Sequence, residues 1–330
     1  MPGGMLQRIQ SPKMEINLMT FKDQILKLAW ETNMTNEDIR AKLGCSVRTV
    51  QHFAGGTLAR IKAKQGNINK QLPRVLILDV ETSPMEFYGW HLFKQTVMPH
   101  QVKKSWAMLS WAAKFLNEPG VYSGVVNPQE AIDRKDASIM NGIYQLIEEA
   151  DILVAHNGKK FDFKRLNYRF AHNGLNPPSP YMVIDTLTES RKMFDLPSHK
   201  LEEVAKALNI DTRKINTNFD LWIRCVHGNV HALEEMEGYN IQDVYLLEDV
   251  YMAMRGWIKS HPNMGLYVEA NEPICPNCGC IELEYNPKPY TTHVSKFKSF
   301  SCLSCGAIGR LRQSTVGKKA RKNLAVSVAR

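Results

Sequence analysis

The stretch Val75-Leu76-Ile77-Leu78-Asp79-Val80-Glu81-Thr82 decides the fold of the central part of this chain. Its continuous aliphatic run predicts a strand that is buried on both faces. Side chains two residues apart in a strand point to the same face, so Asp79 and Glu81 present two carboxylates side by side. Such a pair repels unless a cation offsets its charge, and Mg²⁺ or Mn²⁺ prefers oxygen ligands of this kind. The alternative interpretation is a strand that ends in two solvated acids.

Two further segments carry polar side chains that can join this pair. Residues 152–155 predict a short strand, which is followed by Asn157 and then by Asp162 at the start of a helix. An acid at a helix N-terminus is also favoured by the helix dipole, so Asp162 has a purely structural explanation as well. Tyr239 and Asp243 are four residues apart in a predicted helix and share one of its faces. A core tyrosine beside a solvated acid is the alternative there.

Taken together, the patterns Asp-x-Glu, Asn-x4-Asp and Tyr-x3-Asp follow one another at intervals of about eighty residues. This order resembles the three motifs of the DEDD exonuclease superfamily in its tyrosine-bearing (DEDDy) branch, over roughly residues 74–258. The branch includes the proofreading domain of B-family DNA polymerases and stand-alone phage-type and bacterial relatives. Gly238 occupies the position, five residues before the last acid, where the other branch has histidine. Residues 183–187 and 198–205 resemble the segment between the second and third motifs.

The resemblance implies an α/β fold, an RNase H-like mixed sheet flanked by helices. It implies a 3′→5′ exonuclease that hydrolyses phosphodiester bonds of DNA to nucleoside monophosphates with two Mg²⁺ or Mn²⁺ ions. In that scheme Asp79 bridges both ions, Glu81 and Asp243 complete the site of the ion that carries the nucleophile, and Asp162 holds the second ion through water. Tyr239 orients the attacking water, which does not require an ionised phenol.

The resemblance also implies substrate contacts near these acids. Asn157 is expected near the scissile end, and Thr82, Met85 and Phe87 are expected to line the terminal nucleotide. Trp106 and Trp111 flank a strand-like run, and we expect them in the core rather than on a base-stacking surface.

Seven cysteines are present, and five of them lie in the last quarter of the chain. Two C-x2-C-G knuckles begin at Cys275 and Cys302, and 23 residues separate Cys278 from Cys302. This spacing predicts one structural Zn²⁺ held by Cys275, Cys278, Cys302 and Cys305 in a zinc ribbon. Cys280 is expected to be a spectator, although it could compete as a ligand, and His293 is the alternative ligand.

Charge is distributed unevenly along the chain, whose formal net charge is +9. Residues 1–74 hold 12 Lys and Arg against 5 Asp and Glu, residues 75–270 hold 20 against 25, and residues 271–330 hold 10 against 3. An acidic centre with basic ends fits a metal-dependent core whose arms hold a polyanion, and nucleic acid is the expected partner. The resemblance to the DEDDy exonucleases implies DNA in preference to RNA. The predicted ribbon contacts are Lys296, Lys298, Arg310 and Arg312. A basic but merely soluble surface is the alternative.

Residues 20–53 predict two or more short helices interrupted at Gly44. They resemble a helix-turn-helix of the homeodomain-like kind, and that resemblance places Arg48, Thr49 and Gln51 against DNA. A helical hairpin that only packs or binds protein is the alternative.

These patterns predict five parts of the chain. They are a helix-turn-helix-like domain (1–56), a basic linker (57–73), the RNase H-like DEDDy exonuclease domain (74–260), a zinc ribbon (271–315) and a basic tail (316–330). Predicted strands of the central domain are 75–81, 86–93, 107–113, 120–126, 152–155 and 182–185, with helices at 137–149 and 162–172.

Neither a signal peptide nor a membrane span is visible in the sequence, so we expect a cytoplasmic protein of a bacterial or phage-infected cell. Three alternatives to a DNA exonuclease stay open. They are the same fold acting on RNA, a structure-specific endonuclease, and a non-catalytic DNA-binding regulator.

Overall fold

The computed structural model describes Leu28 and residues 36–43, 64–91, 93–212, 215 and 217–325. Its contacts divide the chain into two compact units, Met1–Lys70 and Gln71–Arg330. In the first unit, helix α2 (Asn36–Leu43) buries Ile39 completely. The remainder of the expected helix-turn-helix, including Arg48, Thr49 and Gln51, lies outside the described residues. Among the described helices, none has the length and apolar character needed to cross a membrane.

The second unit contains a five-stranded mixed sheet in the order β5-β4-β1-β6-β7. Its strands are β1 (Val75–Thr82), β4 (Met108–Phe115), β5 (Tyr122–Val125), β6 (Ile152–Ala155) and β7 (Met182–Asp185). β1 pairs antiparallel with β4 and parallel with β6, and β7 continues the parallel half. Because β1, β6 and β7 run in the same direction, the segments that follow them meet at one edge of the sheet. Both acids of β1 lie toward this edge.

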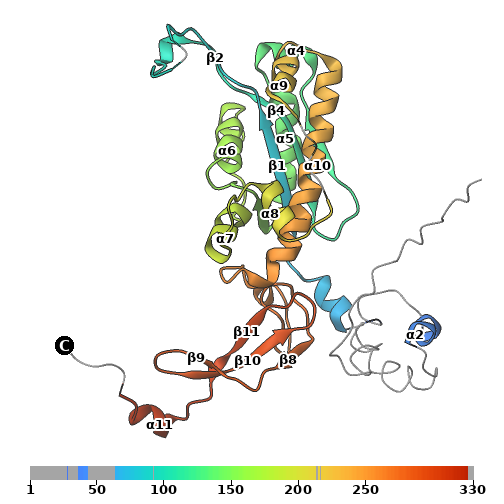
Figure 1. Cartoon of the computed structure of the whole chain (residues 1–330), viewed down its shortest axis with the longest axis vertical. Coiled ribbons are helices and arrows are strands. Elements are labelled where there is room, and N and C mark those ends of the chain that lie inside the picture. The colour runs from blue at the N-terminus through green and yellow to red at the C-terminus, as the bar shows by residue number, and fades with distance from the viewer. Residues whose placement is uncertain are drawn as a thin grey trace, which may run out of the picture. The chain divides into compact units, whose positions relative to one another are not determined.

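Helices cover both faces of the sheet. They are α4 (Pro128–Asp133), α5 (Ala137–Glu148), α6 (Asp162–His172), α7 (Thr186–Met193), α8 (Leu201–Ala207), α9 (Phe219–Val226) and α10 (Val230–Met254). Short 3₁₀ helices are η1 (Pro99–Gln101), η2 (Arg255–Trp257) and η3 (Met264–Leu266). Figure 1 shows the long helix α10 running alongside β1. A mixed sheet flanked by helices is the fold class that the sequence predicted.

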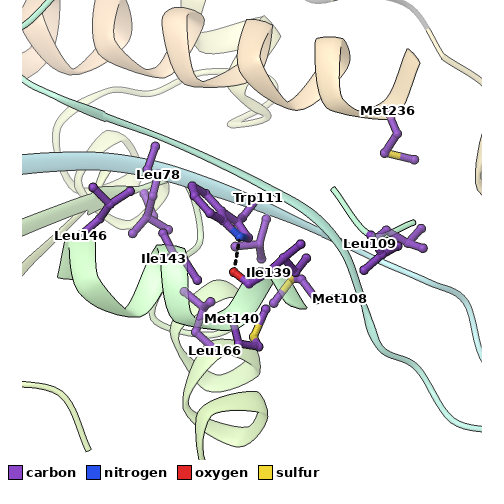
Figure 2. Close-up of a cluster of buried hydrophobic side chains, with 14 of the residues drawn as sticks. Leu78, Met108, Leu109, Trp111, Ile139, Met140, Ile143, Leu146, Leu166 and Met236 are labelled. Atoms are coloured by element: carbon purple, nitrogen blue, oxygen red, sulfur yellow. Dashed lines mark hydrogen bonds between the residues drawn. The ribbon is translucent and has the colours of Figure 1, made fainter. Parts of the chain in front are cut away.

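Alternation along β1 separates two hydrophobic clusters. Leu76, Leu78 and Val80 enter a cluster that includes the apolar stripe of α5, where Ile139 and Ile143 lie one turn apart. Figure 2 shows part of this cluster, with the indole nitrogen of Trp111 donating a 2.8 Å hydrogen bond to the carbonyl of Ile139. Trp111 is therefore a core residue, as expected.

The other face of β1 packs against α8 and the C-terminal half of α10. Val75 and Ile77 enter this second cluster together with Val244 and Val250. Asp79 and Glu81 continue the same odd-numbered series, so alternation directs both carboxylates toward the α10 side of the sheet.

Past the core, residues 271–325 form a smaller sheet. It contains β8 (Leu283–Tyr285), β9 (Tyr290–Thr291), β10 (Lys296–Cys302) and β11 (Ile308–Ser314), followed by helix α11 (Lys318–Lys322). β10 lies in the centre and pairs antiparallel with each of the other three strands.

Among the described residues of the expected strand at 86–93, only the first two form a strand, so the rest of that prediction is wrong. β2 (Glu86–Phe87) is short and pairs with β3 (Val102–Lys104), which the sequence did not suggest. The side-chain oxygen of Gln95 accepts hydrogen bonds from the backbone N–H groups of Trp90 and His91 at 3.0 and 3.2 Å. These donors are consequently used in a turn and not in a strand ladder.

Candidate active site

Three carboxylates converge where β1 meets α10. One oxygen from each of Asp79, Glu81 and Asp243 lies within 4.8 Å of the other two. The acids come from positions far apart in the sequence, and the fold brings them together because the odd-numbered face of β1 packs on α10. Three hard anionic oxygens this close repel one another in the absence of a cation, and they are the ligands that Mg²⁺ and Mn²⁺ prefer. The donor set therefore fits a divalent ion.

A hydrogen-bonded amide holds the first of these acids. The side-chain nitrogen of Asn240 donates to Asp79 Oδ2 at 2.6 Å, and its oxygen accepts from the hydroxyl of Ser110 at 3.2 Å. Asn240 and Ser110 are both completely buried. Asn240 was not predicted from the sequence, although its place between Tyr239 and Asp243 was an available signal.

Asp162 lies in the same cleft but outside the group of three. It opens α6, as expected, and its Oδ1 accepts a 3.3 Å hydrogen bond from the N–H of Val80 in β1. Burial raises the pKa of Asp162 to about 7, and nearby Asp185 adds to the rise. The N–H of Val80 and the cation of Arg165 oppose this rise only in part. A neighbouring positive charge would thus strongly stabilise the ionised form of Asp162.

A cleft of about 830 Å³ surrounds the acids. Asp79, Glu81, Asp162 and Asp243 all line it, together with Asn157 and the loop 197–200. Asn157 follows β6 with a left-handed φ of 71°, a conformation that asparagine tolerates better than most residues. Its N–H donates to Asp185 Oδ1 at 3.2 Å. Asp185, at the end of the neighbouring strand β7, thereby fixes the turn that carries Asn157.

A histidine also ties the cleft loops to the sheet. The ring of His156 contacts the hydroxyl of Thr186 and the carbonyl of His199, each at 2.9 Å. The ring of His199 in turn contacts the hydroxyl of Ser190 at 3.0 Å. These contacts hold the loop 197–200 against the end of β6.

A second cleft of about 650 Å³ adjoins the first and is richer in aromatic side chains. Glu81 and Phe161 line both clefts. Tyr239 lines the second one and packs edge-on against Trp222, with ring centroids 5.9 Å apart. Trp106 lies here too, so the expectation that it is a core residue is wrong. The reason is that Trp106 precedes β4 and stacks under the guanidinium of Arg165, 4.5 Å from its centroid.

The remaining expected substrate contacts divide between the clefts and the surface. Thr82 and Met85 line the second cleft, and Thr82 accepts a 2.8 Å hydrogen bond from Arg165. Phe87 lies in β2 and is not among the residues that line either cleft. Arg165, which was also not predicted from the sequence, stands one helical turn after Asp162 on α6 and interacts electrostatically with both Asp162 and Glu81.

Four cysteines converge in the smaller sheet. The sulfur atoms of Cys275, Cys278, Cys302 and Cys305 all lie within 4.8 Å of one another. A tetrahedral thiolate set is a donor set that Zn²⁺ prefers, and these residues fit that ion. Cys280 and His293 do not belong to this group among the residues that the structure describes. Lys296, Lys298, Arg310 and Arg312 are exposed on β10 and β11.

Comparisons with known proteins bear on the fold. Residues 122–255 match the RNase_H superfamily, a segment that contains Asp162, Tyr239 and Asp243 but begins after Asp79 and Glu81. No curated protein matches this chain. The family B DNA polymerase from the hyperthermophilic archaeon Pyrobaculum calidifontis is similar in structure, with a TM-score of 0.40 and 13% sequence identity. That similarity covers 55% of this chain and 25% of the polymerase chain, so this chain spans a quarter of the polymerase's length.

Proposed function

We propose that this protein is a metal-dependent 3′→5′ exonuclease of the DEDDy type, which hydrolyses phosphodiester bonds of DNA and releases nucleoside monophosphates. The observation behind this proposal is the convergence of Asp79, Glu81 and Asp243 within 4.8 Å at the floor of a cleft. The RNase_H superfamily match over residues 122–255 supports nuclease chemistry in general. Tyr239, one helical turn before Asp243 in α10, supports the tyrosine-bearing type.

The four acids supply the charge for two divalent cations. When bound, such cations neutralise charge on the attacking and leaving oxygens of a phosphodiester. Asp79, Glu81 and Asp243 form one donor group, and Asp162 faces the cleft from α6. Asn240 restrains Asp79, so this carboxylate is oriented before substrate arrives.

Tyr239 is the group best suited to position the attacking water. Its ring is nearly buried and is held by Trp222, so the direction of its hydroxyl is restricted. A phenol positions water by hydrogen bonding in its neutral form, which is the form present at neutral pH.

The clefts beside the acids suit the end of a nucleic-acid strand. The second cleft lies next to the acids and is lined by Met85, Trp106 and Phe161, which can hold the terminal nucleotide. Aromatic and thioether side chains can pack against a base without reading its sequence. The smaller sheet, with one structural Zn²⁺ in its cysteine group, adds exposed cations that can hold the phosphate backbone.

The test is hydrolysis of 5′-labelled and 3′-labelled single- and double-stranded DNA and RNA, with Mg²⁺, with Mn²⁺ and with chelator. We expect the 3′ label to be released as a mononucleotide and the 5′-labelled strand to shorten stepwise. Both should occur only when metal is present. Asp79→Asn and Asp243→Asn should each lower the rate by at least about 10²-fold, because each removes a charged ligand. Asp133→Asn, an exposed acid at the end of α4, is the matched control and should keep full activity.

Different results favour the alternatives. Release from RNA but not DNA would replace the substrate, and internal cuts in a circular strand would indicate an endonuclease. Full activity in a folded Asp79→Asn variant, or no hydrolysis of any of these substrates, would rule out the proposed chemistry.

A further inference from the structure

Residues 86–91 and 93–104 form an arm that exposes its aromatic side chains. Tyr88, Trp90 and Phe93 have 69%, 89% and 82% of their surface exposed. Figure 1 shows the segment around β2 extending away from the helices that flank the sheet. It is unusual for a folded domain to expose several large aromatic side chains so close together in the chain. Such a group indicates a binding surface.

The arm is held in a defined shape by its own polar groups. Gln101 accepts from the N–H of Met98 at 2.8 Å and donates to the carbonyl of Tyr88 at 3.1 Å. The N–H of Tyr88 donates to the carbonyl of Gln101 at 2.9 Å. Gln95 holds Trp90 and His91 from the other side of the turn. The aromatic rings are therefore presented on a folded hairpin.

The charge of the arm identifies the class of partner. Between Phe87 and Asn117 the sequence has no Asp or Glu, whereas Lys94, Lys103 and Lys104 lie within the arm. Glu86, at its root, is paired with Arg134 at 2.8 Å and with Lys103 at 3.9 Å. The arm is thus cationic although residues 75–270 are acidic as a whole. Interleaved aromatic and cationic side chains fit a single-stranded polynucleotide, whose bases stack and whose phosphates are anionic.

The arm begins and ends at the second cleft, the one that is richer in aromatic side chains. Pro84 and Met85, just before β2, line that cleft, and so does Trp106, two residues after β3. Glu81 and Tyr239 line the same cleft. At its root, Glu86 and Lys104 are tied to α4, through Arg134 and the carbonyl of Ile132. A nucleic-acid strand that lies on the arm can therefore extend into the site where its end would be cleaved.

We propose that this arm binds single-stranded nucleic acid by stacking bases on Tyr88, Trp90 and Phe93, and that it holds the part of the substrate strand that precedes the terminal nucleotide. The second half of this statement rests on the proposed exonuclease function. The first half does not, because it concerns binding alone. A protein partner or a second copy of this chain would also cover aromatic side chains, but the lysines and the lack of any acid in the arm after Glu86 favour a polyanion.

Binding is measured with the full chain carrying Asp79→Asn, so that the strand is not consumed. The probe is a fluorescently labelled poly-dT of about 15 nucleotides, close to the upper site size of compact single-strand binders. Adding Trp90→Ala and Phe93→Ala should weaken binding by at least about fivefold for each ring removed. Trp257→Ala, which removes an indole that is 64% exposed in η2, is the matched control and should leave binding unchanged.

Activity gives an independent measurement in the chain with intact acids. The double variant Trp90→Ala/Phe93→Ala should raise KM for long strands and leave hydrolysis of a dinucleotide unchanged, because a dinucleotide does not reach the arm. If the wild-type chain hydrolyses nothing but the arm variants still lose affinity for poly-dT, the exonuclease proposal fails and the binding arm stands.

Two results would overturn the arm proposal. One is unchanged affinity for poly-dT in the folded double variant. The other is a change from dimer to monomer on adding Trp90→Ala, measured by light scattering, which would assign the arm to an interface between copies of this chain.

Discussion

Asn240 of α10 donates a 2.6 Å hydrogen bond to Asp79 of β1, and its own side-chain oxygen is held by Ser110 of β4. One buried amide therefore connects the central strand β1 and its neighbour β4 to the helix that carries Tyr239 and Asp243. The contact orients the carboxylate of Asp79.

Replacing Asn240 should impair the acid site without unfolding the protein. Asn240→Ala removes the donor to Asp79, and we expect metal affinity or activity to fall by about 10- to 100-fold, the usual effect of losing a partner behind a metal ligand. The measurement is the Mn²⁺ dependence of hydrolysis together with the thermal unfolding temperature. Ser110→Ala, which leaves the contact with Asp79 in place, should have a smaller effect on the Mn²⁺ dependence. Equal effects of the two substitutions would contradict an orienting role for Asn240.

The buried ion pair of Asp136 and Arg169, on the side of the sheet covered by α5 and α6, should contribute strongly to the free energy of unfolding. Arg169 Nη2 donates to Asp136 Oδ1 at 2.6 Å, and the N–H of Met108 donates to Oδ2 at 2.9 Å. Both side chains are at least 95% buried. Asp136→Ala leaves a buried cation without its partner, and we expect it to lower the free energy of unfolding by about 3–5 kcal/mol. Urea unfolding checks this value. Asp133→Ala, which removes a more exposed acid paired with Lys135 at 3.6 Å, should cost less than about 1 kcal/mol.

The cysteine group should stabilise the end of α10. Asn277, inside the first knuckle, donates to the carbonyls of Arg255 and Ile258 at 2.8 and 3.0 Å. We expect the purified protein to contain one zinc per chain and Cys305→Ser to lose it, because a structural site requires its full ligand set. Hydrogen exchange should then accelerate at residues 255–258, and the unfolding temperature should fall by several degrees, since metal binding contributes to folding.

Cys280→Ser is the matched control for this experiment. Cys280 is buried beside the group, and its sulfur accepts from the N–H of Glu282 at 3.4 Å, a contact that a serine hydroxyl can also make. The variant should keep its zinc. Loss of zinc from Cys280→Ser, or retention of zinc by Cys305→Ser, would mean that the ligand set is wrong.

Acid should destabilise the protein through His261. Burial lowers the pKa of His261 from 6.5 to about 4, Arg255 contributes to this lowering, and Glu189 opposes it. The ring contacts the hydroxyl of Tyr251 at 2.9 Å and the carbonyl of Pro262 at 2.7 Å. Between pH 6.5 and 4 the unfolded chain binds a proton at this residue and the folded chain does not, so stability falls as pH falls through this range. The full effect is about 3 kcal/mol.

Urea unfolding at several pH values between 7 and 4 measures this term. His261→Gln keeps a polar side chain that does not titrate, so its stability should depend less steeply on pH than that of the wild-type chain. Subtracting the two curves removes the contribution of every other group. Parallel curves would show that His261 is not responsible.

Much of the fold could be predicted because it depends on local patterns. The apolar run of β1, the amphipathic stripe of α5 and the acid at the start of α6 each follow from residues that are close together in the sequence. The structure confirms these elements to within about two residues, the ordinary spread of boundary assignments. The arm after β2 was mispredicted because its turn is made by side-chain contacts from Gln95, which periodicity does not reveal.

The sequence by itself determined which chemical groups this protein has: two acids at the end of one strand, two more on helices, a tyrosine one turn from the last acid, and two paired-cysteine knuckles. Only the tertiary structure decided which of them meet. Packing of α10 on β1 brings Asp243 to Asp79 and Glu81 and places the amide of Asn240 against Asp79, and the contact of Trp106 with Arg165 of α6 puts this indole in the cleft and not in the expected core. The physical reason is that residue type and local periodicity act over a few residues, whereas these contacts depend on how buried faces far apart in the chain pack against each other.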